Sequence, residues 1–221
     1  MATYLITGSN RGIGLEYCRQ LKNRGEEVIA ACRNSSEELD SLNIRIETGI
    51  DVTSGSSVIN LLKNIKNSKI DVLIHNAAIC ENNSLSNLDP ESISRQFEVN
   101  ALSPLCFTRA LINNLGEGSK IVLMTSRMGS IEDNTSGGSY GYRMSKAALC
   151  MLGKSLSIDL QYKGISVALL HPGLVSTRMT SFTHNGITPE ESVEGLLKII
   201  DKLNLENSGT FWHSNGEVLP W

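Results

Sequence analysis

Cysteine is scarce in this 221-residue sequence, and no two cysteines form a CxxC pair. The cysteines are odd in number and widely spread, at Cys18, Cys32, Cys80, Cys106 and Cys150. This pattern excludes a dense disulfide framework and a zinc site, and we expect no bound metal. It favours reduced thiols and therefore a reducing compartment.

An excess of one charge and long hydrophobic runs are also missing. The formal net charge is −3, with 40% hydrophobic and 19% charged residues, which excludes a disordered chain and gives no basic footprint for nucleic acid. No run approaches the ~18 apolar residues of a membrane span, and no basic residue precedes the short apolar run at the start, unlike a signal peptide. We expect a cytoplasmic protein without membrane or nucleic-acid partners.

Short apolar runs instead alternate with longer helix-like segments. The predicted strands are residues 3–7, 27–31, 44–50, 70–75, 120–125, 165–170 and a weaker 210–213. Continuous apolar strands between helices predict an α/β fold: a single doubly wound, Rossmann-type domain of three layers with a seven-stranded parallel sheet. No repeat or linker divides the chain, so we expect one domain over residues 1–221.

A glycine-rich turn, Gly8-Ser9-Asn10-Arg11-Gly12-Ile13-Gly14, follows the first predicted strand and precedes a helical pattern. In doubly wound sheets, ligands bind beyond the carboxyl ends of the strands. Glycines let such a turn approach a pyrophosphate, and the helix N-terminus favours its charge. A glycine cluster alone fits a purely structural turn equally well, but this position favours dinucleotide binding.

Residues after the second and third strands extend the predicted dinucleotide site. Arg33 stands where an NAD-specific site usually has an acidic residue, so Arg33, together with Arg11, suits the 2′-phosphate of NADP(H). The alternative is that both arginines are solvated surface cations. Asp51-Val52 follows the third strand, and the Asp51 carboxylate can either accept from an adenine amino group or cap the next helix.

Two further segments complete this site. His75-Asn76-Ala77-Ala78 follows the fourth strand, and its small residues let the backbone at Asn76 and Ala77 lie against a cofactor. His171-Pro172-Gly173-Leu174-Val175-Ser176-Thr177 follows the sixth strand as a rigid turn. We expect Pro172, Gly173, Val175 and Thr177 to contact a nicotinamide carboxamide, and His171 to be structural.

Ser126 follows the fifth strand, and Tyr142 and Lys146 come later on one predicted helix face. An adjacent ammonium and an oxidised nicotinamide would stabilise a phenolate and bring a tyrosine closer to the range where it exchanges protons at neutral pH. Tyr-x-x-x-Lys alone occurs often by chance. Tyr140 has Met144 rather than lysine at the same offset, so Tyr142 is the better candidate.

Asn100 lies in another predicted helix, which begins with Asp89 as N-cap and Pro90 at the first helical position. Pro104 has no N–H for the Asn100 carbonyl, which predicts a kink. The freed carbonyl can hold a water that starts a proton relay, or the kink has no further role.

These motifs together, in order and over nearly the whole chain, resemble the short-chain dehydrogenase/reductase family. The stretches Arg127-Met128-Gly129-Ser130-Ile131, Thr188-Pro189-Glu190-Glu191-Ser192 and Asn215 to Trp221 are similar to the subgroup of sniffer-like carbonyl reductases and C-factor-like proteins. One departure is His75-Asn76-Ala77-Ala78, where the family commonly has Asn-Asn-Ala-Gly. The departure would crowd a cofactor slightly but not abolish binding, because alanine adds only a methyl group.

The resemblance implies an NADPH-dependent carbonyl reductase in which hydride comes from the nicotinamide. It implies Tyr142 as general acid, Ser126 as the group that orients the carbonyl, Lys146 as the residue that lowers the tyrosine pKa and binds ribose, and Asn100 as the holder of the relay water. Family members often pair through the helices carrying Asn100 and Tyr142, but the subgroup also includes monomers, so the resemblance favours a homodimer and leaves a monomer as the alternative.

Two other functions compete with this interpretation. Gly137-Gly138-Ser139-Tyr140-Gly141 fits the hydrolase pattern G-x-S-x-G, but the polar segment before it is not a strand. A dinucleotide-binding regulatory protein of C-factor type with little turnover is the second alternative. Residues 178–189 are predicted to form a short lid, and its small size favours small or planar carbonyl substrates such as quinones, diketones or aldehydes.

Overall fold

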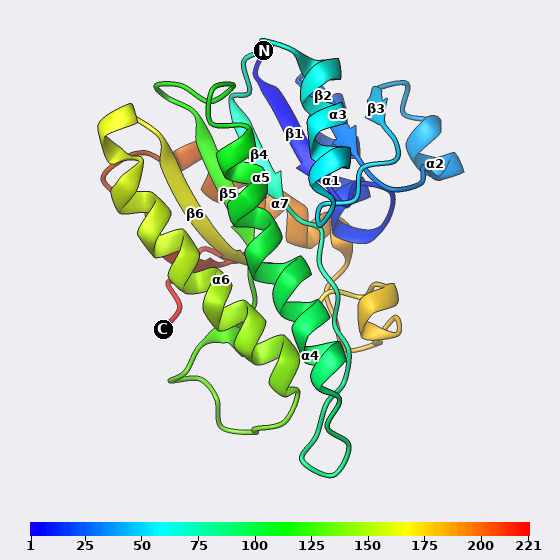
Figure 1. Cartoon of the computed structure of the whole chain (residues 1–221), viewed down its shortest axis with the longest axis vertical. Helices are drawn as coiled ribbons and strands as arrows, with labels where there is room; N and C mark the ends of the chain where they lie inside the picture. The colour runs from blue at the N-terminus through cyan, green and yellow to red at the C-terminus, as the bar shows by residue number, and fades with distance from the viewer.

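The computed structural model describes residues 1–221, which form a seven-stranded parallel sheet in the order β3-β2-β1-β4-β5-β6-β7 (Figure 1). The strands are β1 (Thr3–Thr7), β2 (Glu27–Ala31), β3 (Arg45–Glu47), β4 (Val72–His75), β5 (Lys120–Met124), β6 (Ser166–His171) and β7 (Thr210–His213). This confirms the predicted doubly wound α/β class. The third strand is shorter than predicted and is soon followed by Gly49, whose φ is 73°.

The helices connect successive strands and cover both faces of the sheet. They are α1 (Gly12–Asn23), α2 (Glu37–Asp40), α3 (Gly55–Ile65), α4 (Pro90–Phe97), the π-helical η1 (Glu98–Leu102), α5 (Ser103–Ala110), α6 (Tyr140–Asp159) and α7 (Pro189–Lys202). Short 3-10 turns are η2 (Arg127–Gly129), η3 (Gln161–Lys163) and η4 (Arg178–Thr180). No helix has the length and apolar character required to cross a membrane.

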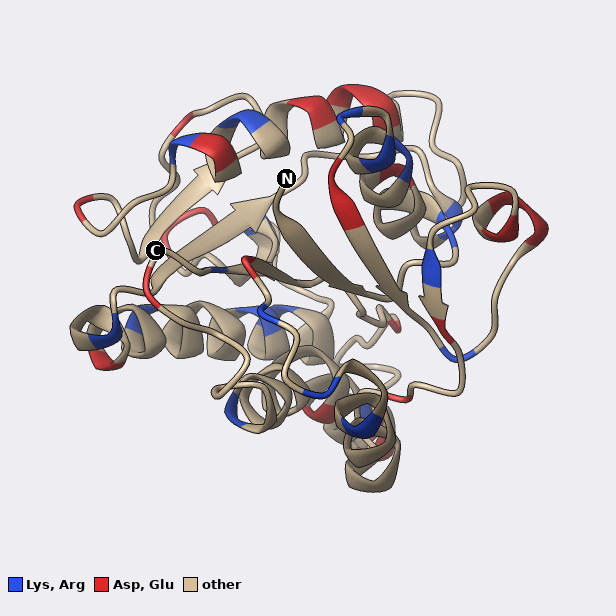
Figure 2. Cartoon of the chain, turned by 90° about the horizontal axis from the view of Figure 1, so that it is seen from above, with Lys and Arg blue, Asp and Glu red and all other residues tan.

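Two hydrophobic cores give the molecule its three layers. On one face, Leu15 of α1 and Leu196 of α7 pack with Ile6 of β1 in a core of 22 buried residues. On the other, Leu61 of α3 and Leu149 of α6 belong to a core of 19 buried residues. Figure 2 shows helices on both sides of the sheet. Because both faces are covered, the inner strands β1, β2, β4, β5 and β6 are mostly apolar and buried, whereas the edge strands β3 and β7 are more polar and less buried.

The strand order reverses between β1 and β4, so the connections leave the sheet in opposite directions there. This switch point opens a crevice at the carboxyl ends of the strands. The loops after β4, β5 and β6 extend beyond that same end of the sheet (Figure 1). The architecture therefore brings together the segments in which the sequence predicts a site.

Asn100 lies within the π-helical turn η1, between α4 and α5. The helix begins as predicted, with the Asp89 side chain accepting hydrogen bonds from the N–H groups of Glu91 and Ser92. Pro104, four residues after Asn100, cannot donate to its carbonyl, and the helical register widens over Glu98–Leu102. The predicted irregularity is present and takes the form of a π turn.

Candidate active site

The glycine turn is packed so closely that two of its glycines cannot carry a side chain. A Cβ on Gly8, whose φ is 66°, would lie 2.8 Å from the Cα of Ala77, and a Cβ on Gly14 would overlap the carbonyl oxygen of Gly8. A Cβ on Gly12, by contrast, would come no closer than 3.5 Å to Thr177. The turn therefore leaves its backbone exposed between β1 and α1, with Asn10 and Ile13 only partly buried.

Asn76 holds this turn in place. Its side-chain amide donates to the carbonyl oxygens of Thr7 and Gly8, both at 3.0 Å. The backbone N–H groups of Asn76 and Ala77 donate to the Thr7 hydroxyl, each at 3.1 Å. The Asn76 amide thus acts on the glycine turn, while the backbone at Ala77 lies directly against Gly8. The sequence predicted the location of both residues but not this role of the amide.

His75 does not crowd the turn, although the family commonly has asparagine there. Its ring is buried, its Nε2 shares a 2.8 Å hydrogen bond with the hydroxyl of Thr108 on α5, and it packs edge-on against Phe107. Burial lowers the pKa of His75 to about 3. The imidazole is therefore neutral and turned away from the glycine turn.

Arg11 and Arg33 are both exposed beside the turn, and neither takes part in an ion pair. Asp51 accepts hydrogen bonds from the N–H and hydroxyl of Thr53, which hold the pKa of its carboxyl below the usual value. The N-cap of α3 is Ser54, so the alternative role of Asp51 as a helix cap is not realised. Val52 is partly buried against the core below.

The turn after β6 closes the other side of the crevice. Gly173 has a φ of 87°, and the Pro172 carbonyl accepts from the hydroxyls of Ser192 and Ser214. Val175 is buried, and Thr177 begins η4 with a capping box in which its backbone N–H donates to the Thr180 hydroxyl. His171 ends β6, and its ring packs edge-on against His213 at 4.9 Å, consistent with a structural role.

Ser126, Tyr142 and Lys146 come together at the carboxyl end of β5, all at least nine-tenths buried. The Lys146 Nζ lies 5.6 Å from the centroid of the Tyr142 ring and donates to the Met124 carbonyl at 2.8 Å. Ser126 stands at the N-cap of η2, where its Oγ accepts from the N–H of Met128. The three polar groups therefore occupy one site in the fold.

Burial is the largest influence on the pKa values of Tyr142 and Lys146. It raises the pKa of Tyr142 above its ordinary value, an effect to which a charge on Cys80 adds and which a hydrogen bond with Ser126 opposes. It also lowers the pKa of Lys146 to about 8. Without a nucleotide, burial thus makes the phenol less acidic than free tyrosine. The prediction of a more acidic phenol applies to the site with an oxidised nicotinamide bound.

Asn100 connects the π turn to the helix that carries Tyr142. Its amide nitrogen donates to the hydroxyl of Ser145 at 3.0 Å, and that hydroxyl donates to the Tyr142 carbonyl at 2.8 Å. The same side chain pairs with the backbone of Ile79 on both its N–H and its carbonyl. Asn100 is thereby fixed within the site predicted for it.

Two site residues were missed by the sequence analysis, Cys80 and Gln96. The Cys80 thiol is exposed and electrostatically coupled to both Tyr142 and Lys146. Gln96 is fully buried under the loop that carries Cys80. The sequence did contain a signal for Gln96, because Ser92, Gln96 and Asn100 repeat every four residues and so share one face of the predicted helix.

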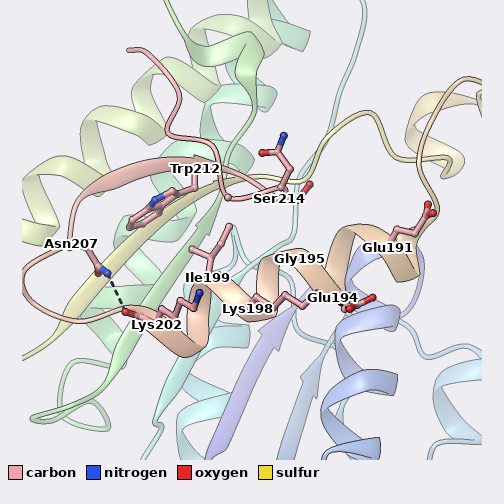
Figure 3. A pocket seen from close by; sticks show the side chains of 11 residues that line it. Glu191, Glu194, Gly195, Lys198, Ile199, Lys202, Asn207, Trp212 and Ser214 are labelled. Carbon is pink, nitrogen blue, oxygen red and sulfur yellow. Dashed lines mark hydrogen bonds and ion pairs between the residues drawn. The ribbon is translucent and has the colours of Figure 1, made fainter.

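Ser139 of the G-x-S-x-G pattern lies at the N-cap of α6, after a loop and not after a strand. A separate groove of about 540 Å³ lies between α7 and the segment around β7, lined by residues such as Lys198 and Trp212 (Figure 3). None of the predicted site residues lines that groove. The site at the strand ends is thus distinct from both features.

The family model for short chain dehydrogenases matches residues 2–187 of the chain. The chain belongs to the short-chain dehydrogenase family. A curated relative, 1-hydroxy-2-glutathionyl-2-methyl-3-butene dehydrogenase of Rhodococcus sp. (strain AD45), is 45% identical over the full length of both chains. C-signal of Myxococcus xanthus is 43% identical and covers 72% of this chain and 96% of its own.

Solved structures place this short-chain dehydrogenase next to carbonyl reductases. The NADPH-bound carbonyl reductase from chicken fatty liver has a TM-score of 0.90 and 29% identity, covering 100% of this chain and 99% of its own. Carbonyl reductase Sniffer of D. melanogaster has a TM-score of 0.90 and 30% identity, with complete coverage of both chains. The predicted family and its sniffer-like and C-factor-like relatives are confirmed.

The residues present fit a dinucleotide. Gly8 and Gly14 leave no room for side chains, the rest of the turn from Asn10 to Ile13 is partly or fully exposed, and two arginines without ion pairs flank it. Backbone N–H groups of a turn at a helix N-terminus suit a pyrophosphate, and arginine suits a phosphate monoester. The crevice therefore has the donor set that the predicted ligand requires.

Proposed function

We propose that this short-chain dehydrogenase is an NADP(H)-dependent oxidoreductase that reduces the carbonyl of an aldehyde, ketone or quinone to an alcohol. The observation that carries the proposal is the burial of Ser126, Tyr142 and Lys146 together beside a glycine turn shaped for a dinucleotide. A buried phenol with a lysine ammonium next to it is suited to donating a proton where an alkoxide develops.

Bound NADPH would supply the hydride. Ser126 and Tyr142 would donate hydrogen bonds to the carbonyl oxygen, which orients the substrate and polarises its carbonyl. Burial keeps the phenol protonated, so Tyr142 retains the proton that it delivers to the developing alkoxide. Lys146 stabilises the resulting phenolate and would bind ribose hydroxyls, while Asn100 would hold the water through which the proton is replaced.

The preference for NADP(H) over NAD(H) rests on two exposed arginines. Arg33 follows β2 and Arg11 lies in the glycine turn, and neither forms an ion pair with a carboxylate. Guanidinium groups bind phosphate oxygens through charge-assisted hydrogen bonds. The chicken carbonyl reductase with bound NADPH supports this assignment. Asp51, Val52, Pro172, Gly173, Val175 and Thr177 would complete the cofactor contacts.

A second candidate is oxidation of an alcohol in the reverse direction. The relative that is 45% identical over its full length is a dehydrogenase of a glutathionyl alcohol, whereas the carbonyl reductases cited above are 29% and 30% identical. A regulatory role with little turnover is a third candidate, supported by the relation to C-signal. The same residues would bind the dinucleotide in all three cases.

Three narrower proposals accompany the main one. Residues 178–189 would form a short lid, and in this segment Ser181 and Phe182 both have positive φ values; its small size favours small or planar carbonyls. Exposed apolar side chains on α4 and α6 would form a homodimer interface. The unpaired cysteines suit a reducing compartment such as the cytoplasm.

A panel of carbonyls and alcohols tests the main proposal. Oxidation of NADPH and NADH by aldehydes, ketones and quinones is followed at the absorbance of the reduced nicotinamide. Reduction of NADP by the matching alcohols and by glutathionyl alcohols is followed in parallel. We expect carbonyl-dependent oxidation of NADPH. Turnover confined to glutathionyl alcohols supports the second candidate, and tight NADPH binding without turnover on the whole panel supports the third.

A further inference from the structure

Two side-chain amides on the helical segment α4–η1 bind the loop after β4 in the same way. Gln96 accepts from the Glu81 N–H at 3.0 Å and donates to the Glu81 carbonyl at 3.1 Å. Asn100, four residues later, accepts from the Ile79 N–H at 2.9 Å and donates to the Ile79 carbonyl at 2.8 Å. Cys80 lies between these two doubly bonded residues and is therefore held from both sides.

Gln96 also joins this loop to the start of α6. The side chain is fully buried, and its amide nitrogen is within hydrogen-bond distance of the Asn83 side-chain oxygen and the Ser92 hydroxyl as well. A Cβ on Gly141 would lie 2.5 Å from that nitrogen, so the first turn of α6 packs directly on Gln96. The next residue is Tyr142, and the loop is thereby fixed relative to the phenol.

The thiol between the two amides lies near the Tyr142–Lys146 pair. Cys80 is exposed as a residue, but partial burial of its thiol raises the thiol pKa, while the Lys146 ammonium lowers it. Lys146 and Tyr142 both respond in turn to a charge on Cys80. The segment 79–81 is tied to α6 on either side of Tyr142, through Gln96 at Gly141 and through Asn100 at Ser145. On the proposed function, it forms a wall of the space in front of Ser126 and Tyr142 where a substrate carbonyl would bind.

We propose that Gln96 is a positioning residue of the substrate pocket, which holds the wall at Cys80 in a fixed place relative to Tyr142. This inference rests on the proposed function. Removing the Gln96 amide leaves the Glu81 N–H and carbonyl without their partners, and unpaired groups of this kind detach a loop from its support. The glycine turn is held separately by Asn76, so dinucleotide binding is independent of Gln96.

The test compares Gln96→Met with wild type, because methionine keeps the length and removes every hydrogen bond. We expect KM for the carbonyl to rise about fivefold or more, with kcat and the NADPH Kd changed by less than about twofold. In the enzyme without nucleotide, iodoacetamide should label Cys80 at least about threefold faster than in wild type, because detaching the loop exposes the buried part of the thiol and removes the burial that raises its pKa. Labelling at Cys106, an exposed thiol on α5, should not change.

Arg95→Ala is the matched control, because the Arg95–Glu81 ion pair of 2.9 Å joins the same two elements at the surface. It should leave KM and Cys80 labelling unchanged, since exposed ion pairs contribute little. If Gln96→Met does not fold, Gly141→Ala presses a methyl group onto the same amide and should give the same changes. The proposal would be overturned if Arg95→Ala changed KM and Cys80 labelling as much as Gln96→Met does. A folded Gln96→Met variant with wild-type KM and wild-type labelling would overturn it as well.

Failure of the proposed function is distinguishable from failure of this inference. If wild type turns over no carbonyl or alcohol, the proposed function fails. The ratio of Cys80 to Cys106 labelling still reports whether Gln96 holds the loop, because it is measured without substrate. An unchanged ratio in both Gln96→Met and Gly141→Ala then refutes the inference as well.

Discussion

Gly129 packs directly on the backbone of Lys146. A Cβ on Gly129 would lie 2.7 Å from the Lys146 carbonyl carbon and 2.9 Å from its oxygen, with no flexible side chain available to yield. Gly129 ends the short turn η2 that begins just after Ser126, and Lys146 lies in α6, four residues after Tyr142. The distance between Ser126 and the Tyr142–Lys146 pair is therefore set by the direct contact of Gly129 with the Lys146 backbone.

Gly129→Ala should push η2 away from α6 and separate Ser126 from Tyr142. We expect kcat/KM for carbonyl reduction to fall about tenfold or more, and the free energy of unfolding to fall by about 1–3 kcal/mol. Gly116→Ala is the control, because a Cβ there meets nothing within 4 Å. Steady-state kinetics and urea unfolding measure both effects, and equal kinetics in the two variants would contradict the spacing role of Gly129.

The fold was predictable because its strands are buried on both faces and the helices between them are long. Each predicted strand exists, and boundaries moved by a few residues where a turn intervenes, as at Gly49. The N-cap at Asp89 was predicted correctly because its chemistry is local. The order of the strands was not predicted, since apolar runs alone do not specify which strands are neighbours.

The site was only partly predictable. The sequence placed Ser126, Tyr142, Lys146 and Asn100 in one site because motifs at strand ends and helix spacing indicate common faces. It gave no sign that burial would raise the pKa of Tyr142, or that the buried face of α4 is polar at Gln96. Both depend on how helices pack against each other, which local spacing does not encode.

Tyr142→Phe removes the proton donor and keeps the packing of the ring. Carbonyl reduction should drop by about 10²-fold or more, while NADPH binding, measured by fluorescence, persists. Tyr140→Phe provides the control on the same helix, since Tyr140 has no lysine one turn later and should retain activity. Undiminished turnover in Tyr142→Phe would refute its role as general acid.

Arg33→Asp should reverse the cofactor preference. Losing a charge-assisted contact and introducing a carboxylate next to a phosphate should weaken NADPH binding by about tenfold or more and leave NADH binding equal or improved. Titration with both nucleotides measures the ratio of the two Kd values. Arg109→Asp, at an exposed position on α5, makes the same charge change and should leave that ratio as it is in wild type. An unaltered ratio in Arg33→Asp means that Arg33 does not contact the phosphate.

The exposed apolar side chains of α4 to α6 should be covered in a homodimer. Met144, Met151 and Ile158 repeat every seven residues on α6 and are 55%, 68% and 63% exposed, and Phe97 on α4 is 46% exposed. A stripe of this size favours association. Met151→Glu should convert a dimer to a monomer in light scattering, whereas Ile59→Glu on α3 should not. A wild-type monomer at micromolar concentration would rule out this interface.

Acid should destabilise the protein through its buried neutral histidines. Burial lowers the pKa of His75 to about 3, and burial with the nearby His213 and Arg127 lowers that of His171 to about 3. As the pH falls below the unfolded value of about 6.5, the unfolded chain takes up these protons and the folded chain does not, so stability decreases with decreasing pH. Above that value the contribution of the neutral rings is fully present.

Urea unfolding at pH 7 and pH 5 should therefore show a loss of stability, of which His75 accounts for about 2 kcal/mol at most. His75→Gln keeps a donor for Thr108 but cannot titrate, so the difference between the two pH values should shrink by that amount, even if the variant is less stable at pH 7. His184→Gln, at an exposed position, should leave the difference unchanged. An identical pH loss in His75→Gln and wild type would mean that the ring is protonated in the folded state, and the hydrogen bond to Thr108 would then have to be donated by the imidazolium.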